Sequence, residues 1–182
     1  NEVGYPCLIK SPCQGSSIGM AIPKDEAHFK KSLLDVFMYG DLVMVEKFVK
    51  GTEVTCAVLD VEDGKSPRAL PVIEICPVDS EFFDYHAKYT PGACNEIVPA
   101  RISAEATKKV QAVAERVHHV IGCSGFSRSD MILDGDDPVW IEINTIPGMT
   151  ETSLYPQAAA AAGVSFSQML TLFVEEALGR NS

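Results

Sequence analysis

Two apolar segments, "GFSRSDMIL" and "VWIEINT", carry Arg128 and three side chains that could bind a metal ion: Asp130, Glu142 and Asn144. Paired as a hairpin centred on Asp136, the segments place Asp130 opposite Glu142. The same pairing places Arg128 opposite Asn144. Carboxylate and amide oxygens suit Mg²⁺ or Ca²⁺ and do not make a zinc set. The pattern favours a magnesium ion that bridges to substrate phosphates, with an exposed polar face on an ordinary antiparallel pair as the alternative.

The second segment runs into "WIEINTIPGMTETS", which is typical of a strand that ends abruptly. Successive side chains point to opposite faces of a strand. We therefore expect Trp140, Glu142 and Asn144 on one face, and Ile141 with Ile143 on the other. The Pro-Gly-Met-Thr run then turns the chain away from the strand.

The loop "CQGSSIG" is a second candidate, because small residues join two predicted strands there. Gly15 and Gly19 would let the backbone approach a ligand, and Ser16 with Ser17 adds hydroxyl donors. The loop lacks the Walker lysine and does not lead directly into a helix, so it is not a P-loop. Lys10, just before it, could direct its ammonium at a bound anion. A plain hairpin turn with a surface lysine is the competing interpretation.

Three more charged residues have both a functional and an ordinary interpretation. Glu46 ends one predicted strand and Glu53 begins the next, so both carboxylates could face a ribose or an amino group. Lys88 lies in a long irregular segment, 79–99, where it could belong to a lid over an anion. Taken singly, each of the three fits a solvated surface position better.

Short strands grouped around helices must position these residues. Helices are predicted at 24–39, at 103–121 with Ser103 as its cap, and from Ser165 onward, where Ser165 and Gln168 form a capping box. Because most strands are joined by hairpins, the sequence predicts an α+β fold with largely antiparallel sheets. The predicted strands are 5–10, 20–22, 41–49, 51–61, 69–77, 125–133 and 139–145.

The composition limits the range of partners. The chain has 182 residues, 46% of them hydrophobic, and a formal net charge of -10. This charge argues against a nucleic-acid surface and against an anionic membrane, although lysines and backbone N–H groups can still bind phosphates locally. No signal peptide and no apolar run of membrane-spanning length are apparent. The six cysteines fit no zinc or redox spacing and are expected to be reduced thiols in a cytosolic protein.

Five segments occur in the order and spacing of D-alanine–D-alanine ligases, which belong to the ATP-grasp superfamily. They are "CLIKSPCQGSSIGM", "VEKFVKGTEVT", "FFDYHAKY", "GFSRSDMIL" and "IEINTIPGMTETS". The chain resembles the C-terminal portion of that family from about residue 4 to about residue 175. The resemblance implies an ATP-grasp fold in which residues 1–45 are a remnant of the central subdomain and residues 46–182 are the C-terminal subdomain.

The resemblance also implies a role for each matched residue. Two Mg²⁺ ions, or Mn²⁺ in their place, would be held by Asp130, Glu142 and Asn144. ATP would be bound by Lys10, Ser16, Ser17, Gly19, Glu46, Lys47, Val49, Glu53 and Lys88. The second D-alanine would be bound by Arg128, Gly148, Ser153 and Leu154. The catalytic residues would be Arg128, Gly148, Ser16 and Tyr89.

The implied activity is formation of the D-alanyl-D-alanine dipeptide for bacterial peptidoglycan. ATP would phosphorylate the carboxylate of one D-alanine, and the amine of a second would displace the phosphate. Arg128 would stabilise the tetrahedral oxyanion. Tyr89, directly after the lid lysine, goes in this family with dipeptide formation, whereas phenylalanine goes with ester formation to D-lactate. A cytoplasmic enzyme that can form a homodimer is expected, with no nucleic acid or membrane as partner.

The chain also departs from the family. It starts at Asn1 without a methionine and lacks an N-terminal domain that would supply a glutamate for the first D-alanine, so we expect it to be inactive alone. Ser11 separates Lys10 from a proline that directly follows the lysine in relatives, and Gln14 replaces a usual glutamate. Two alternatives stay open: another ATP-grasp carboxylate–amine ligase, and a non-catalytic nucleotide-binding module.

Overall fold

The computed structural model describes residues 3–15, 18–60, 67–77 and 94–179. The chain divides into two compact units, one formed by 1–49 and 77–94 and the other by 50–76 and 95–182. The expected division into 1–45 and 46–182 stays a prediction. Ser16, Ser17, Lys88 and Tyr89 lie outside the described residues.

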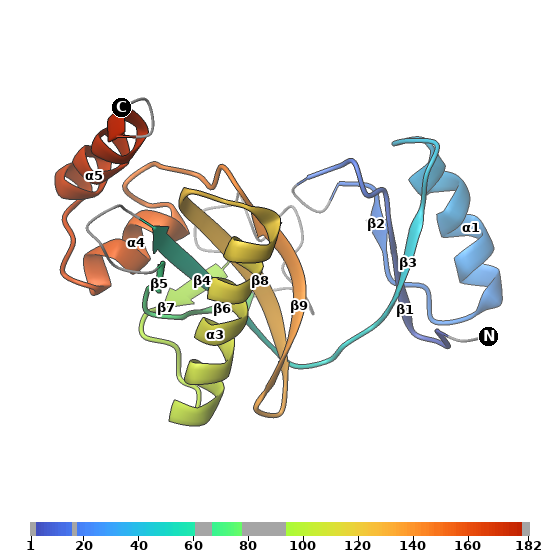
Figure 1. The fold of residues 1–182 in the computed structure, drawn as a ribbon. Coiled ribbons are helices and arrows are strands. Elements are labelled where there is room, and N and C mark those ends of the chain that lie inside the picture. The colour runs from blue at the N-terminus through green and yellow to red at the C-terminus, as the bar shows by residue number, and fades with distance from the viewer. Residues whose placement is uncertain (1–2, 16–17, 61–66, 78–93, 180–182) are drawn as a thin grey trace. The chain divides into compact units, whose positions relative to one another are not determined.

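The first unit contains a three-stranded antiparallel sheet with one helix on it (Figure 1). The strand order is β2-β1-β3, with β1 at Cys7–Lys10, β2 at Met20–Ala21 and β3 at Met44–Lys47. Helix α1, Glu26–Phe37, begins at Asp25, whose carboxylate accepts from the backbone N–H of His28 at 2.8 Å. Cys7 and Ile9 face this helix and form a small core with Val36. Lys10 therefore lies on the opposite face, because side chains alternate along β1.

The second unit is built on a larger sheet with the strand order β7-β6-β4-β8-β9, and β5 pairs with β4. The recorded pairings of β4 with β5, β6 and β8, and of β8 with β9, are antiparallel, which confirms the predicted class. The strand bounds are β4 Thr52–Asp60, β5 Arg68–Ala69, β6 Ile73–Pro77, β7 Cys94–Ile97, β8 Gly125–Asp134 and β9 Asp137–Asn144.

Helix α3, Ala104–Ile121, covers one face of the second unit's sheet (Figure 1). Ser103 caps its start by accepting from the backbone N–H of Ala106 at 3.0 Å, and Gly122 ends it in the left-handed region at φ 76°. Both ends were predicted. The buried core between this helix and the sheet consists of Val54, Cys56, Val58, Val72, Ala106, Val110, Ala114, Met131 and Leu133.

Two C-terminal helices cover one end of the other face. They are α4, Leu154–Ala161, and α5, Phe166–Gly179. Phe126 of β8 packs on Phe173 with ring centroids 4.4 Å apart, and buried Tyr155 donates its hydroxyl to the carbonyl of Val58 at 2.9 Å. The predicted capping box is confirmed, because the Ser165 N–H donates to the Gln168 side chain at 2.9 Å and the Gln168 N–H donates back at 3.3 Å.

A bulge decides which side chains of the β8–β9 hairpin face each other. The turn pairs Asp134 with Asp137, and that register would carry Asp130 opposite Ile141. The register shifts between Asp130 and Met131, so that Met131 pairs with Trp140 and Asp130 pairs with Glu142. The predicted pairing of Asp130 with Glu142 is confirmed. The prediction that Trp140 shares their face is wrong, because the extra residue of the bulge turns Trp140 toward the face of Met131.

Two other predicted elements differ from the structure. The single strand at 69–77 is divided into β5 and β6 by Leu70, Pro71 and Val72, because a proline has no N–H for a ladder hydrogen bond. The segment expected to be irregular contains β7. Residues 78–93 of that segment lie outside the described part of the chain.

Candidate active site

The candidate site lies on the face of the second unit's sheet that points away from α3. Thr55 of β4, Asp130 of β8 and Glu142 of β9 are paired in one row across three neighbouring strands. Arg128 and Asn144 pair in the next row. Paired residues point to the same face, so the structure brings these side chains together.

Four donor hydrogens satisfy the Asp130 carboxylate. Arg128 donates through Nε to Oδ1 at 3.0 Å and through Nη2 to Oδ2 at 2.9 Å. Asn144 donates its Nδ2 to Oδ2 at 3.1 Å, and Thr55 donates its hydroxyl to Oδ1 at 2.6 Å. The bidentate arginine and the two flanking donors fix the plane of the carboxylate.

Arg128 keeps its charge although it is largely buried. Burial alone would lower the pKa of Arg128, but the Asp130 carboxylate, with Glu142 and Glu96 nearby, raises it instead. A guanidinium that is always protonated and held by one carboxylate can direct its remaining N–H groups at a second anion. This arrangement suits the stabilisation of an oxyanion.

The donor set fits a magnesium ion. Within the part of the chain that the structure describes, no three histidine, cysteine, aspartate or glutamate side chains gather as they would around a metal ion. The candidate ligands are instead two carboxylates and one amide, Asp130, Glu142 and Asn144. Because Asn144 gives its Nδ2 to Asp130, its amide oxygen is directed elsewhere and can serve as a ligand. Oxygen ligands of this kind, few in number, suit Mg²⁺ that keeps other positions for water and phosphate.

Helix α3 anchors the turn of the hairpin that carries these ligands. The Ser103 hydroxyl donates to Asp136 Oδ1 at 3.0 Å, and Lys109 forms an ion pair with Asp137 at 2.7 Å. Both contacts lie at the far end of the hairpin from Asn144. They hold the hairpin against the helix, so the candidate ligands lie on a strand pair that is anchored at its turn.

The chain after β9 closes on itself around Ser153. The Ser153 hydroxyl accepts from the Thr150 N–H at 3.1 Å and lies 2.7 Å from the Thr150 hydroxyl. A Cβ on Gly148 would lie 2.9 Å from the Ser153 hydroxyl, so a larger residue there would displace that hydroxyl from its bonds to Thr150. Leu154 begins α4 with its side chain buried, which leaves its backbone N–H as the group able to meet a ligand.

The first unit brings two of the predicted nucleotide-binding side chains together. Lys10 of β1 and Glu46 of β3 lie on the face away from α1 and form an ion pair of 2.7 Å. Lys47 pairs with Cys7 and therefore points to the opposite face. Val49 follows the end of β3 and is half-buried. The structure thus groups Lys10 with Glu46 and leaves Lys47 apart.

Gly19 and Gln14 both lie against Tyr39, which follows α1. Gly19 has a φ of 65°, and a Cβ there would lie 2.6 Å from the ring of Tyr39. Gln14 donates its side-chain amide to the Tyr39 carbonyl at 3.2 Å. The amide hydrogen makes this bond possible, because an ionised carboxylate at the same position would have no hydrogen to donate.

Glu53 and Thr55 share one face of β4, because they are two residues apart on the strand. Glu53, predicted to bind the ribose, therefore lies on the same face of the sheet as Asp130. Thr55 was not predicted. The sequence indicated Thr55 only through the alternation of side chains along the strand, which places Thr55 on the same face as Glu53.

A serine, a histidine and an aspartate also meet on the α3 face. His118 Nδ1 lies 2.7 Å from the Ser127 hydroxyl, and Nε2 lies 3.2 Å from Asp60 Oδ2. Ser127 and His118 are completely buried, so no substrate can reach that hydroxyl. The group ties α3 to β8 and β4 and is not a catalytic triad.

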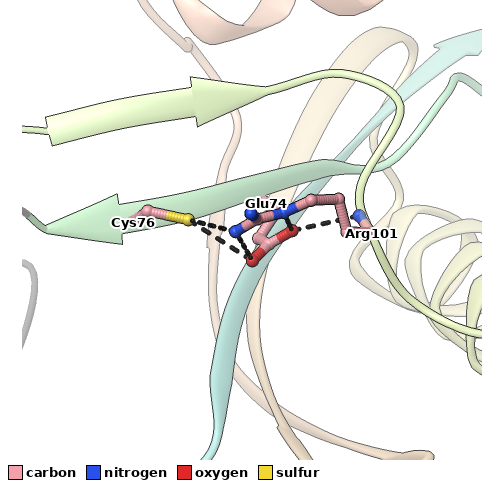
Figure 2. Close-up of polar contacts among 3 residues, drawn as sticks. All are labelled: Glu74, Cys76 and Arg101. Atoms are coloured by element: carbon pink, nitrogen blue, oxygen red, sulfur yellow. Dashed lines mark hydrogen bonds and ion pairs between the residues drawn. The ribbon is translucent and has the colours of Figure 1, made fainter.

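A second arginine–carboxylate pair also lies on the α3 face. Glu74 pairs with Val54, a core residue beneath that helix. Arg101 donates to Glu74 through Nη2 at 2.8 Å, through Nε at 3.0 Å and through its backbone N–H at 3.0 Å. Cys76 lies beside the pair, 3.3 Å from both partners (Figure 2). These bonds tie β6 to the segment that leads into α3.

The chain belongs to the family described as D-ala D-ala ligase C-terminus, whose model matches residues 1–175. A D-alanine–D-alanine ligase of Syntrophobacter fumaroxidans is 46% identical over 179 residues, which are 98% of this chain and 57% of the relative. The chain therefore spans little more than half the length of the relatives it matches. The expected α+β ATP-grasp architecture is confirmed by solved structures of this family.

Two solved structures show the same fold at similar identity. The D-alanine–D-alanine ligase of Bacillus anthracis complexed with ATP has a TM-score of 0.78 and 34% identity, covering 97% of this chain and 55% of that one. The VanG D-Ala:D-Ser ligase of Enterococcus faecalis has a TM-score of 0.80 and 38% identity, covering 94% of this chain and 49% of that one.

The described helices include none that could cross a membrane alone. The pair α4 and α5, bent by 104° at their junction, reaches the required length and composition only when the two are taken together.

Proposed function

We propose that the whole protein is an ATP-dependent ligase that forms the D-alanyl-D-alanine dipeptide, and that this chain contributes the groups for Mg²⁺, ATP and the second D-alanine. One observation carries the proposal: Arg128, Asp130, Glu142 and Asn144 meet on one face of a rigid strand pair. The family and the ATP complex of a relative support it.

Asp130, Glu142 and Asn144 would hold Mg²⁺, with Mn²⁺ as a substitute. When bound, the metal neutralises phosphate charge during phosphoryl transfer. The protein's own contribution is a set of oxygen ligands whose positions are fixed in advance by the sheet and by the anchored hairpin turn.

The ATP contacts in this proposal come from residues along the chain. Lys10 would neutralise phosphate charge, and Glu53 would accept from ribose hydroxyls. Glu46, Lys47 and Val49 would line the adenine site, partly through backbone groups. The loop with Ser16, Ser17 and Gly19 and the segment with Lys88 and Tyr89 would close over the phosphates.

The second half-reaction would use Arg128 and the chain after β9. The amine of the second D-alanine attacks the carbonyl carbon of the first, which carries the phosphate received from ATP. The C–N bond forms, the C–O bond to phosphate breaks, and the amine releases a proton. Arg128 and the Gly148 N–H would stabilise the oxyanion, while Ser153 and the Leu154 N–H would bind the carboxylate of the second D-alanine.

D-Alanine would be the small-molecule partner, in the bacterial cytoplasm, where the dipeptide enters peptidoglycan synthesis. We also propose that the whole enzyme can form a homodimer. The likeness to a D-Ala:D-Ser ligase supports D-serine as an alternative second substrate. Tyr89 favours an amine nucleophile over D-lactate.

The direct test uses the whole gene product that contains this chain. ADP release should require Mg²⁺ and D-alanine together, and the product should be D-alanyl-D-alanine by mass spectrometry. Asp130→Asn should abolish it, whereas Asp134→Asn, at the exposed end of the same strand, should not. Replacing D-alanine by D-serine or D-lactate as nucleophile measures the preference. Full activity of Asp130→Asn would contradict the proposal.

A further inference from the structure

We propose that Thr55 is a positioning residue whose hydroxyl orients the Asp130 carboxylate for the divalent cation. This inference rests on the proposed function, because it concerns the same metal site. Among the described donors on Asp130, Thr55 is the one that the expected metal-binding and substrate-binding residues do not include. It lies on β4, whereas Arg128 lies on β8 and Asn144 on β9.

The position of Thr55 in the sheet holds its hydroxyl against Asp130. Thr55 is 1% exposed, at the middle of the central strand β4, and it is paired directly with Asp130 across the ladder. A β-branched side chain in such a place has little freedom at χ1. The hydroxyl therefore cannot turn to a solvent partner without leaving its packing.

The hydroxyl's single hydrogen goes to the carboxylate. Thr55 Oγ1 lies 2.6 Å from Asp130 Oδ1 and 3.2 Å from the backbone carbonyl of Ser129. A hydroxyl has one hydrogen, and the shorter bond to a charged acceptor is the stronger one. The Ser129 carbonyl is the weaker alternative acceptor for the same hydrogen.

Thr55 differs from the other donors on Asp130 because it is not expected to contact a ligand itself. Arg128 and Asn144 are expected to meet an oxyanion and a cation, and both must be able to rearrange their contacts on Asp130 when ligands bind. Thr55 is buried and has no such second task. It can hold Oδ1 in place throughout, so that Oδ2 can meet the metal when Arg128 or Asn144 gives up its bond to that atom.

The test measures Mn²⁺ binding to the whole gene product in the presence of ADP by electron paramagnetic resonance. Thr55→Val removes the hydroxyl at nearly constant volume, and we expect the Mn²⁺ dissociation constant to rise about 10- to 100-fold. Thr55→Ser restores the hydroxyl and should return Mn²⁺ binding close to that of the unaltered protein. ADP affinity without metal should stay unchanged in both.

Ser129→Ala is the matched control. It removes a buried hydroxyl from the neighbouring strand, one that has no hydrogen-bond partner among the described residues, and its side chain points to the α3 face. Mn²⁺ binding should not change. If Thr55→Val does not fold, Thr55→Ala replaces it. This variant removes the same hydroxyl, and the Mn²⁺ dissociation constant should rise by the same factor.

Each outcome decides between the two proposals. If the unaltered protein binds Mn²⁺ and Thr55→Val binds it equally well, the role of Thr55 is wrong and the proposed function stands. If Thr55→Ser is as weak as Thr55→Val, packing and not the hydroxyl is responsible, and the inference is again wrong. If the unaltered protein binds no Mn²⁺, the proposed metal site fails and the role of Thr55 fails with it.

Discussion

The second unit holds two arginine–carboxylate pairs on opposite faces of one sheet, and their surroundings differ. Arg101 meets Glu74 on the face beneath α3, and Arg128 meets Asp130 on the other face. Val54, paired with Glu74, and Thr55, paired with Asp130, are consecutive residues of β4, which is why the pairs point in opposite directions.

The pair on the α3 face is complete in itself. Glu74 is nearly buried, while the Arg101 side chain is 64% exposed and covers it. The side chain and backbone N–H of Arg101 and the Cys76 thiol all bond to Glu74 (Figure 2). The hydrogen bonds from Arg101 lower the pKa of Glu74 to about 2. This pair fastens two segments of the chain together.

The Arg128–Asp130 pair, on the other face, has more polar neighbours than are needed to join two strands. Arg128 and Asp130 are equally buried, each 15% exposed in the side chain, and Thr55, Asn144 and Glu142 surround them. A second carboxylate and an amide beside the ion pair offer further oxygens that could bind a cation. The comparison shows that an arginine–carboxylate pair indicates function only through the groups that gather around it.

The largest expected difference between the pairs is in catalysis. Arg128→Lys loses the two parallel N–H donors and should lower turnover of the whole enzyme about 10²- to 10³-fold. Arg101→Lys is the matched control, and turnover per folded molecule should stay near that of the unaltered protein. Steady-state ADP release, normalised to folded protein by circular dichroism, measures both. Equal losses in the two variants would remove the distinction.

A smaller difference is expected in stability and its pH dependence. Glu74→Gln should lower the free energy of unfolding at pH 7 by about 1–3 kcal/mol, because a charged hydrogen-bond acceptor is lost. The pKa of Glu74 is about 2 in the folded protein, below the ordinary value of 4.5. The stabilisation is therefore complete above about pH 4.5 and is lost as the pH falls toward 2.

Urea titrations of the unaltered protein and Glu74→Gln at several pH values measure this. The gap between them should be constant from pH 7 to pH 5 and should shrink between pH 4.5 and pH 2. Asp134→Asn, at an exposed strand end, should show no such pH-dependent gap. A gap that widens with acidification would show that Glu74 is not held by Arg101 as described.

The sequence predicted which polar side chains of the hairpin face each other, because their contacts are local. Asp130 and Glu142 are joined by a short turn, and the alternation of the strands pairs them. The bulge at Ile141 could not be predicted, because one extra residue leaves the apolar pattern almost unchanged. That is why Trp140 was assigned to the wrong face.

Contacts between distant segments could not be predicted. Thr55 and Asp130 are 75 residues apart, and nothing in either segment specifies the register of β4 against β8. The contact between Glu74 and Arg101 could not be predicted either, because it joins β6 to a segment 27 residues further along the chain. The roles assigned to ATP-binding residues came from resemblance and stay predictions.

The most direct measurement is a crystal structure of the whole gene product with Mn²⁺ and ADP, in which anomalous scattering locates the metal. The account predicts Mn²⁺ about 2.0–2.6 Å from oxygens of Asp130 and Glu142, with the Asn144 side-chain oxygen among the ligands of the site. Manganese located away from these three side chains, with the ADP phosphates bound elsewhere on the protein, would contradict it.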